Sequence, residues 1–148
     1  MKKCAEIMTH DVECCVPTTT IDQVAKVMKT QNIGPVVVVD TLQSKKPVGI
    51  ITDRDLACKV LGEGRDPKST KVEDVMTRNV QVCTSDEPVE HALKLMAMKQ
   101  VRRMPIVDST QRLQGIITQG DIANRLKDHA KTAELVEAVS KTPAGTRA

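Results

Sequence analysis

An internal repeat constrains the fold of this chain more than any other feature of its sequence. The segment Ile7-Met8-Thr9 recurs as Val75-Met76-Thr77, 68 positions later. Further along, Gly49-Ile50-Ile51-Thr52 recurs as Gly115-Ile116-Ile117-Thr118 at an offset of 66, so the first copy carries two extra residues. These fall in a polar turn, where insertions cost little free energy. The repeat therefore predicts two copies of one folding unit.

Each copy is predicted to have the element order β-α-β-β-α, from its hydrophobic periodicity. The first copy has predicted strands at 12–16, 36–39 and 48–51, a helix that Thr20 caps and Gly34-Pro35 ends, and a helix at 56–61 that Gly62 or Gly64 ends. In the second copy, Asp86 and Pro88 open the first helix, strands follow at 104–107 and 114–118, and a last helix begins at 122–126.

One copy of about 60 residues buries little surface by itself. We therefore expect an α+β fold in which the two copies pack sheet to sheet, with pseudo-two-fold symmetry and two clefts between them. The predicted boundaries are 6–63 for the first domain, 64–73 for a linker, 74–127 for the second domain, and 128–148 for a C-terminal helical segment and frayed tail.

Composition excludes several classes of function. The net charge of +3 and the absence of Phe, Tyr and Trp argue against nucleic-acid binding. No apolar run is long enough for a membrane span, and no signal peptide is visible, so we expect a cytoplasmic protein with reduced thiols. A nucleophile beside a histidine and a P-loop are both missing, so we expect no enzyme activity.

Two segments carry a family resemblance. They are residues 48–55 (VGIITDRD) and 114–121 (QGIITQGD), in which a Gly-hydrophobic-hydrophobic-Thr strand is followed by an aspartate. With the Met-Thr segments and the strand at 101–108 (VRRMPIVD), they resemble the CBS domain, named for cystathionine β-synthase. Small stand-alone bacterial pairs of the hypoxia-response type are the most similar in pattern.

That resemblance implies a regulatory module that often forms a homodimer. It implies AMP, ADP or ATP as the ligand, less often S-adenosylmethionine or NAD, and a regulated partner protein whose identity the sequence does not give. No cofactor is required.

A nucleotide needs partners for its ribose hydroxyls and cations for its phosphate. Asp55 and Asp121 suit ribose, although Thr-x-x-Asp is also a common helix capping box. Arg102 and Arg103 suit phosphate, although both could be solvated cations at a helix end. The first copy has no cation at the matching positions, so we expect the Asp121 cleft to bind phosphorylated ligands better.

The resemblance implies that each cleft draws on both copies. The residues predicted for the Asp121 cleft are Thr9, Cys14, Ile33, Gly34, Pro35, Arg102, Arg103, Ile117, Thr118 and Asp121. Those predicted for the second cleft are Ile51, Thr52, Asp55, Thr77, Val82 and Val101.

Five cysteines leave an alternative open. Cys14, Cys15 and Cys83 lie on predicted first strands, with His10 and His91 as the only nearby imidazoles in the sequence. We expect no metal site, because thiols usually behave as small apolar groups. The alternative to a nucleotide sensor is a structural, stress-response protein that responds to metal or redox state.

Overall fold

The chain forms two compact units in the computed structural model, which describes residues 2–125. Unit 2 is residues 12–80, and in unit 1 residues 2–11 join residues 81–125. The start of the first repeat, up to Asp11, thus packs with the second repeat. The helical segment predicted at 128–148 lies outside the described residues.

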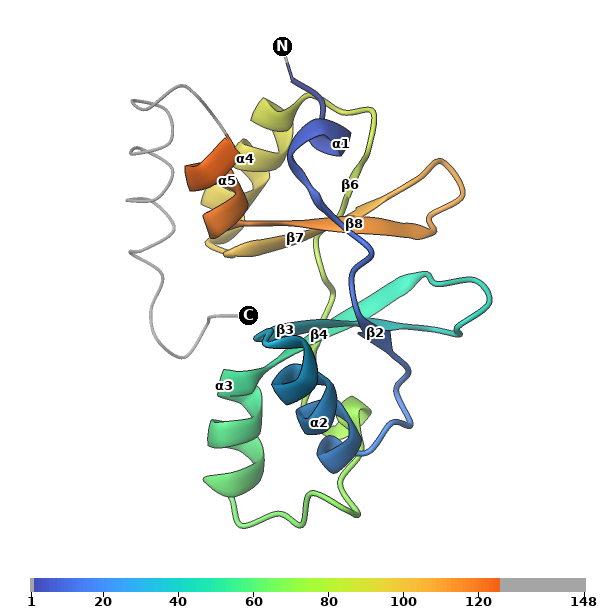
Figure 1. Ribbon diagram of the computed structural model, residues 1–148, viewed down its shortest axis with the longest axis vertical. Helices are drawn as coiled ribbons and strands as arrows, with labels where there is room; N and C mark the ends of the chain where they lie inside the picture. Colours follow the sequence, from blue (N-terminus) through green and yellow to red (C-terminus); the bar gives the residue numbers. More distant parts are fainter. Residues whose placement is uncertain (1, 126–148) are drawn as a thin grey trace. The chain divides into compact units, whose positions relative to one another are not determined.

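Unit 2 contains a four-stranded sheet of order β2-β3-β4-β5. Its elements are β2 (Cys14–Cys15), α2 (Ile21–Gln31), β3 (Pro35–Val39), β4 (Pro47–Thr52), α3 (Asp53–Asp55), a π-helix (Leu56–Leu61), a 3-10 helix (Val72–Asp74) and β5 (Thr77–Arg78). β2 runs parallel to β3, and the other pairs are antiparallel. Figure 1 shows α2 and the helix that begins with α3 on the same face of the β3–β4 hairpin.

Unit 1 repeats this arrangement with the order β6-β7-β8-β1. Its elements are α1 (Cys4–Ile7), β1 (Thr9–His10), β6 (Cys83–Thr84), α4 (Val89–Lys99), β7 (Arg103–Val107), β8 (Leu113–Thr118) and α5 (Gln119–Arg125). Its core joins α1, α4 and the sheet, with Ile7, Met96 and Ile117 fully buried. The α+β class and the β-α-β-β-α order of each repeat are therefore confirmed.

The long helix of the first repeat ends differently from the sequence prediction. We expected Gly34-Pro35 to end the first one, but α2 ends at Gln31 because Asn32 adopts the left-handed conformation at φ 54°. The N–H of Asn32 bonds to the carbonyl of Met28, and Gln100 ends α4 in the same way at φ 52°. This is the usual left-handed cap of a helix, here without glycine.

The predicted linker is partly built into unit 2. Val72 is fully buried, and its N–H donates to the carbonyl of Thr19 at 2.8 Å. The carbonyl of Thr70 accepts from the N–H of Ile21, the first residue of α2. These bonds hold the end of the linker against the start of α2.

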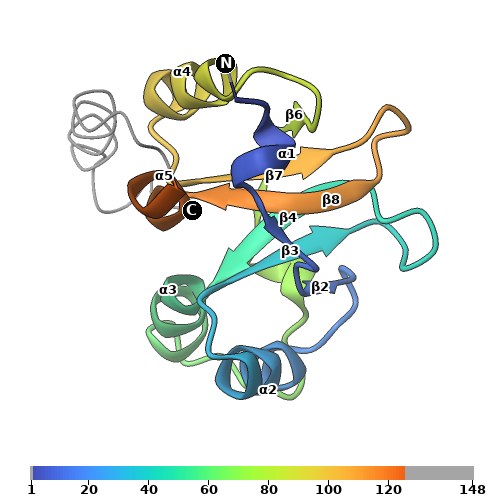
Figure 2. The same cartoon turned by 45° about the horizontal axis from the view of Figure 1, so that its top comes forward.

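The glycine of each Gly-Ile-Ile segment has a packing reason. A Cβ on Gly115 would lie 2.5 Å from the carbonyl oxygen of Thr9, and a Cβ on Gly49 would lie 2.8 Å from that of Thr77. A side chain at either position would collide with the paired strand. Glycine therefore allows β1 to pair closely with β8, and β5 with β4. Figure 2 shows the N-terminal segment leaving α1 and running beside β8.

Candidate functional site

Three polar side chains of unit 1 meet where β8 ends. The hydroxyl of Thr9, on β1, donates to Oδ1 of Asp121 at 2.8 Å. The other carboxylate oxygen, Oδ2, accepts from the backbone N–H of Thr118 at 2.9 Å and from its hydroxyl at 3.1 Å. The three residues, predicted for one site, are therefore brought together inside one unit. We call them the Thr9–Asp121 cluster, with Thr118 as its third member.

The same contacts form a helix capping box. The Thr118 hydroxyl also accepts from the N–H of Asp121 at 3.2 Å, which closes the reciprocal pair of bonds typical of a helix start. The capping interpretation of Thr-x-x-Asp therefore holds. It leaves Asp121 oriented by bonds to neutral groups, and among the described residues no cation forms an ion pair with it.

Two consecutive arginines lie where the neighbouring strand, β7, begins. Arg103 is the first residue of β7 and stands opposite Thr118 in the strand register. The carbonyl of Arg102 accepts from the N–H of Gln119, the residue that starts α5. Nε of Arg102 is buried, and no group within residues 2–125 accepts a hydrogen bond from it. Leaving a buried N–H without an acceptor costs free energy, so a ligand that supplies an acceptor here is favoured.

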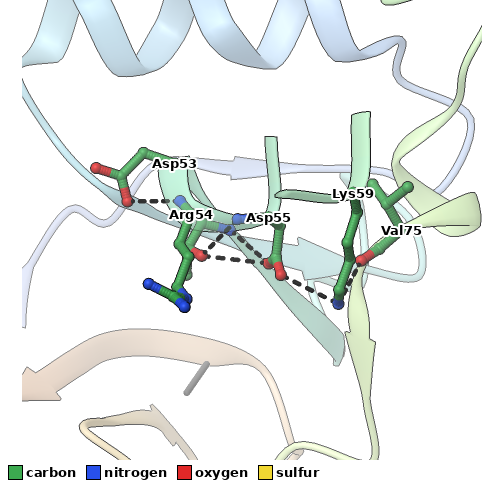
Figure 3. Close-up of polar contacts among 6 residues, drawn as sticks. Asp53, Arg54, Asp55, Lys59 and Val75 are labelled. Carbon is green, nitrogen blue, oxygen red and sulfur yellow. Dashed lines mark hydrogen bonds and ion pairs between the residues drawn. The ribbon is translucent and has the colours of Figure 1, made fainter. Parts of the chain in front are cut away.

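The matching aspartate of unit 2 has a different environment (Figure 3). Oδ2 of Asp55 accepts from the N–H and hydroxyl of Thr52, as in unit 1. Its Oδ1, however, lies 3.1 Å from Nζ of Lys59, which also donates to the carbonyl of Val75. Asp55 is only 4% exposed, so its charge is buried and neutralised. Sequence analysis missed Lys59, although its i,i+4 spacing from Asp55 on a predicted helix signals such a pair.

The remaining predicted residues divide between the two units. Unit 2 holds Cys14, Ile33, Gly34, Pro35 and Thr77, and unit 1 holds Val82 and Val101. Ile51 and Ile117 are fully buried, and their side chains belong to the cores of their own units. The structure thus gathers Thr9, Thr118 and Asp121 by hydrogen bonds, and none of the bonds described here joins Thr77 to Asp55.

All five cysteines are free thiols. Burial is the main cause that raises the pKa of Cys4 to about 11 and the pKa values of Cys15 and Cys83 to about 12. These three groups are therefore protonated at neutral pH. None of the helices formed by residues 2–125 has the length and apolar character needed to cross a bilayer.

Sequence comparison identifies relatives of this chain. The CBS domain profile matches residues 4–62 and 72–128. An uncharacterised protein of Methanopyrus kandleri is 40% identical over 117 residues, or 79% of this chain and 59% of its own length. An inosine-5'-monophosphate dehydrogenase of Methanocaldococcus jannaschii is 41% identical over 127 residues, or 86% of this chain. The chain spans only 24% of the length of that enzyme.

Hypoxic response protein 1 of Mycobacterium tuberculosis matches along most of both chains. It is 30% identical over 130 residues, which cover 88% of this chain and 89% of that protein. A crystal structure of Hypoxic Response Protein I with two coordinated zinc ions has a TM-score of 0.74 and 28% identity, and the match covers 84% of this chain and 99% of that one.

A second solved structure shares the fold of both repeats. The CBS domain pair of protein MJ0100, in complex with 5'-methylthioadenosine and S-adenosyl-L-methionine, has a TM-score of 0.73 and 31% identity. The match covers 84% of this chain and 94% of that one. This chain therefore belongs to the CBS-domain family and carries a CBS domain pair, a regulatory module.

Proposed function

We propose that this CBS domain pair senses an adenine nucleotide, AMP, ADP or ATP, and that the Thr9–Asp121 cluster holds its ribose. The observation that carries the proposal is the carboxylate of Asp121. Hydrogen bonds from Thr9 and Thr118 fix its orientation, and no ion pair with a described residue neutralises it.

Ribose chemistry fits this carboxylate. Each carboxylate oxygen has two acceptor positions, and Oδ1 of Asp121 uses one of them for the hydroxyl of Thr9. The free position accepts from a ribose hydroxyl, and the Thr9 oxygen can accept from its neighbour. Thr9 is exposed and Asp121 is half-buried, so a ligand can reach both.

Phosphate binding is assigned to Arg102 and Arg103. The strand register sets Arg103 opposite Thr118, and the carbonyl of Arg102 accepts from the N–H of Gln119. A guanidinium presents a planar set of donors that matches phosphate oxygens. The buried Nε of Arg102 lacks an acceptor among residues 2–125, so its N–H is available to donate a hydrogen bond to an anion.

The adenine ring must bind without aromatic stacking, because the chain contains no Phe, Tyr or Trp. Aliphatic side chains and backbone groups would hold it instead. Support comes from the CBS domain pair of MJ0100, whose complex contains two adenine-bearing molecules, 5'-methylthioadenosine and S-adenosyl-L-methionine. We therefore keep S-adenosylmethionine in the test below as a competitor.

The different environments of Asp55 and Asp121 predict that the two sites bind a nucleotide with unequal affinity. Lys59 already neutralises Asp55, and the first repeat has Ile33-Gly34-Pro35 where the second has Val101-Arg102-Arg103. We propose that the Asp121 site is the stronger one. The module would act without catalysis, as a homodimer whose ligand shifts the population of a shape that a regulated partner recognises.

Equilibrium dialysis of adenosine, AMP, ADP and ATP tests the proposal, with S-adenosylmethionine as a competitor. The Arg102→Gln variant should bind AMP about tenfold more weakly or worse, because it loses a charge-assisted bond to phosphate, and should bind adenosine as the wild type does. The exposed Arg54→Gln variant is the matched control in the first repeat. Absence of binding by every nucleotide would refute the sensor function, and equal loss for adenosine and AMP would remove Arg102 from phosphate binding.

A further inference from the structure

Three metal-binding side chains of unit 1 converge at the start of α4, away from the proposed nucleotide contacts in the sequence. Cys83 lies on β6, Glu87 precedes α4, and His91 lies in the first turn of that helix. One donor atom from each, a sulfur, a carboxylate oxygen and an imidazole nitrogen, lies within 4.8 Å of the other two. Their spacing in the sequence is Cys-x3-Glu-x3-His.

The carboxylate of Glu87 is oriented by its neighbours. Its Oε1 accepts from the backbone N–H of Thr84 at 3.2 Å and from the Thr84 hydroxyl at 3.2 Å. Its Oε2 is buried and contacts Nδ1 of His91. A cation bound between this buried oxygen and the imidazole nitrogen would coordinate both atoms.

The first repeat shows that the turn itself does not need these residues. At the matching positions it carries Cys15, Thr19 and Gln23. There the N–H of Val16 bonds to the hydroxyl of Thr19 at 3.2 Å, just as the N–H of Thr84 bonds to Glu87. An acceptor at this position is enough to hold the turn. The carboxylate and the imidazole are therefore additional features of the second repeat.

We propose that Cys83, Glu87 and His91 form a binding site for a divalent cation of the zinc class. A set of one sulfur, one nitrogen and one oxygen donor suits Zn²⁺ or Co²⁺ and is poor for Mg²⁺ or Ca²⁺, which prefer oxygen. Ligand atoms at zinc bond lengths stand about 3–4 Å apart, so the cluster has to contract only slightly. The Cys83 thiol loses its proton to solvent as the metal–sulfur bond forms.

The geometry also gives the cation a route to the site. Cys83 is 1% exposed, but the side chain of His91 is 53% exposed. The metal would enter past His91, and water would take the fourth coordination position on that side. This site uses none of the residues proposed for nucleotide binding, so either proposal can fail without the other.

Titration of the full-length, metal-free, reduced protein with Co²⁺ tests the site. Thiolate coordination gives a sulfur-to-cobalt charge-transfer band in the near ultraviolet, and the chain has no aromatic residue to obscure it. We expect the band to saturate at one equivalent and to disappear when Zn²⁺ is added. A titration without a charge-transfer band would overturn the proposal.

Three variants identify the ligands. Cys83→Ser should abolish the band, while Glu87→Thr and His91→Gln should each weaken Co²⁺ binding about tenfold or more. The last two install the residues that the first repeat carries at these positions, so the fold accommodates them. Circular dichroism checks the fold of each variant. Cys15→Ser, the matched thiol of the first repeat, should bind as the wild type does, and unchanged binding by His91→Gln would contradict the site.

Discussion

The hydroxyl of Thr9 donates a 2.8 Å hydrogen bond to the carboxylate of Asp121, across 112 positions of the sequence. The bond exists because the first residues of the chain leave their own repeat and pair with β8 of the other. A single repeat would therefore lack one of the side chains that hold Asp121. The pair of repeats, rather than either copy, is the unit that assembles this cluster.

Gly115 controls the position of Thr9. A Cβ at Gly115 would lie 2.5 Å from the Thr9 carbonyl and 2.8 Å from Sδ of Met8, so Gly115→Ala must displace β1. We expect the variant to lose about 1–3 kcal/mol of unfolding free energy from overpacking and to bind AMP more weakly. Chemical denaturation followed by circular dichroism, with AMP dialysis, measures both effects.

Gly49→Ala is the matched control for this prediction. Its Cβ would lie 2.8 Å from Sδ of Met76 and from the Thr77 carbonyl, so its stability cost should be similar. It leaves Thr9 in place and should spare AMP binding. If AMP affinity falls equally in Gly115→Ala and Gly49→Ala, the position of Thr9 does not determine AMP binding.

The backbone of Lys45 adopts a left-handed conformation that is strained for a residue with a side chain. It holds φ 51° in the turn between β3 and β4, where an L-residue with a side chain pays a steric cost. We expect Lys45→Gly to raise the free energy of unfolding by about 0.5–1 kcal/mol, the steric relief exceeding the entropy lost by glycine. Asn32→Gly should have a smaller effect, because asparagine tolerates φ 54° well. Urea denaturation compares the two, and a larger gain at Asn32 would contradict the argument.

Buried thiols predict a loss of stability at alkaline pH. Burial raises the pKa of Cys15 to about 12 from an ordinary value of 9.0, so the thiol ionises in the unfolded chain before it does in the folded one. The stabilising effect is complete below pH 9 and is lost as the pH rises toward the folded pKa. The free energy of unfolding of the reduced, metal-free protein should therefore fall between about pH 9 and pH 10, by roughly 1 kcal/mol less in Cys15→Ala than in the wild type. Equal losses in the two proteins would show that Cys15 does not ionise differently on unfolding.

The sequence predicted the repeat, the element order and the capping boxes because each depends on local pattern. It did not predict that Asn32 and Gln100 end their helices, since both adopt a conformation for which glycine is the usual signal. The ion pair of Lys59 with Asp55 was also missed, and with it the charge pairing of that buried carboxylate. Sequence analysis weighed Cys83 and His91 as metal ligands and expected no site. It missed Glu87, because the meeting of the three side chains depends on how β6 enters α4, which spacing alone does not fix.

The most direct test of the nucleotide-sensor account is dialysis of AMP against the wild type, Asp121→Ala and Asp55→Ala. Because the chain has no aromatic residue, the ultraviolet band of bound adenine is seen almost without a protein background. We predict saturable binding by the wild type, a loss of about 1–3 kcal/mol in Asp121→Ala from the missing charge-assisted bonds, and a smaller loss in Asp55→Ala. Equal AMP affinity of the wild type and Asp121→Ala, with both proteins folded, would contradict the account.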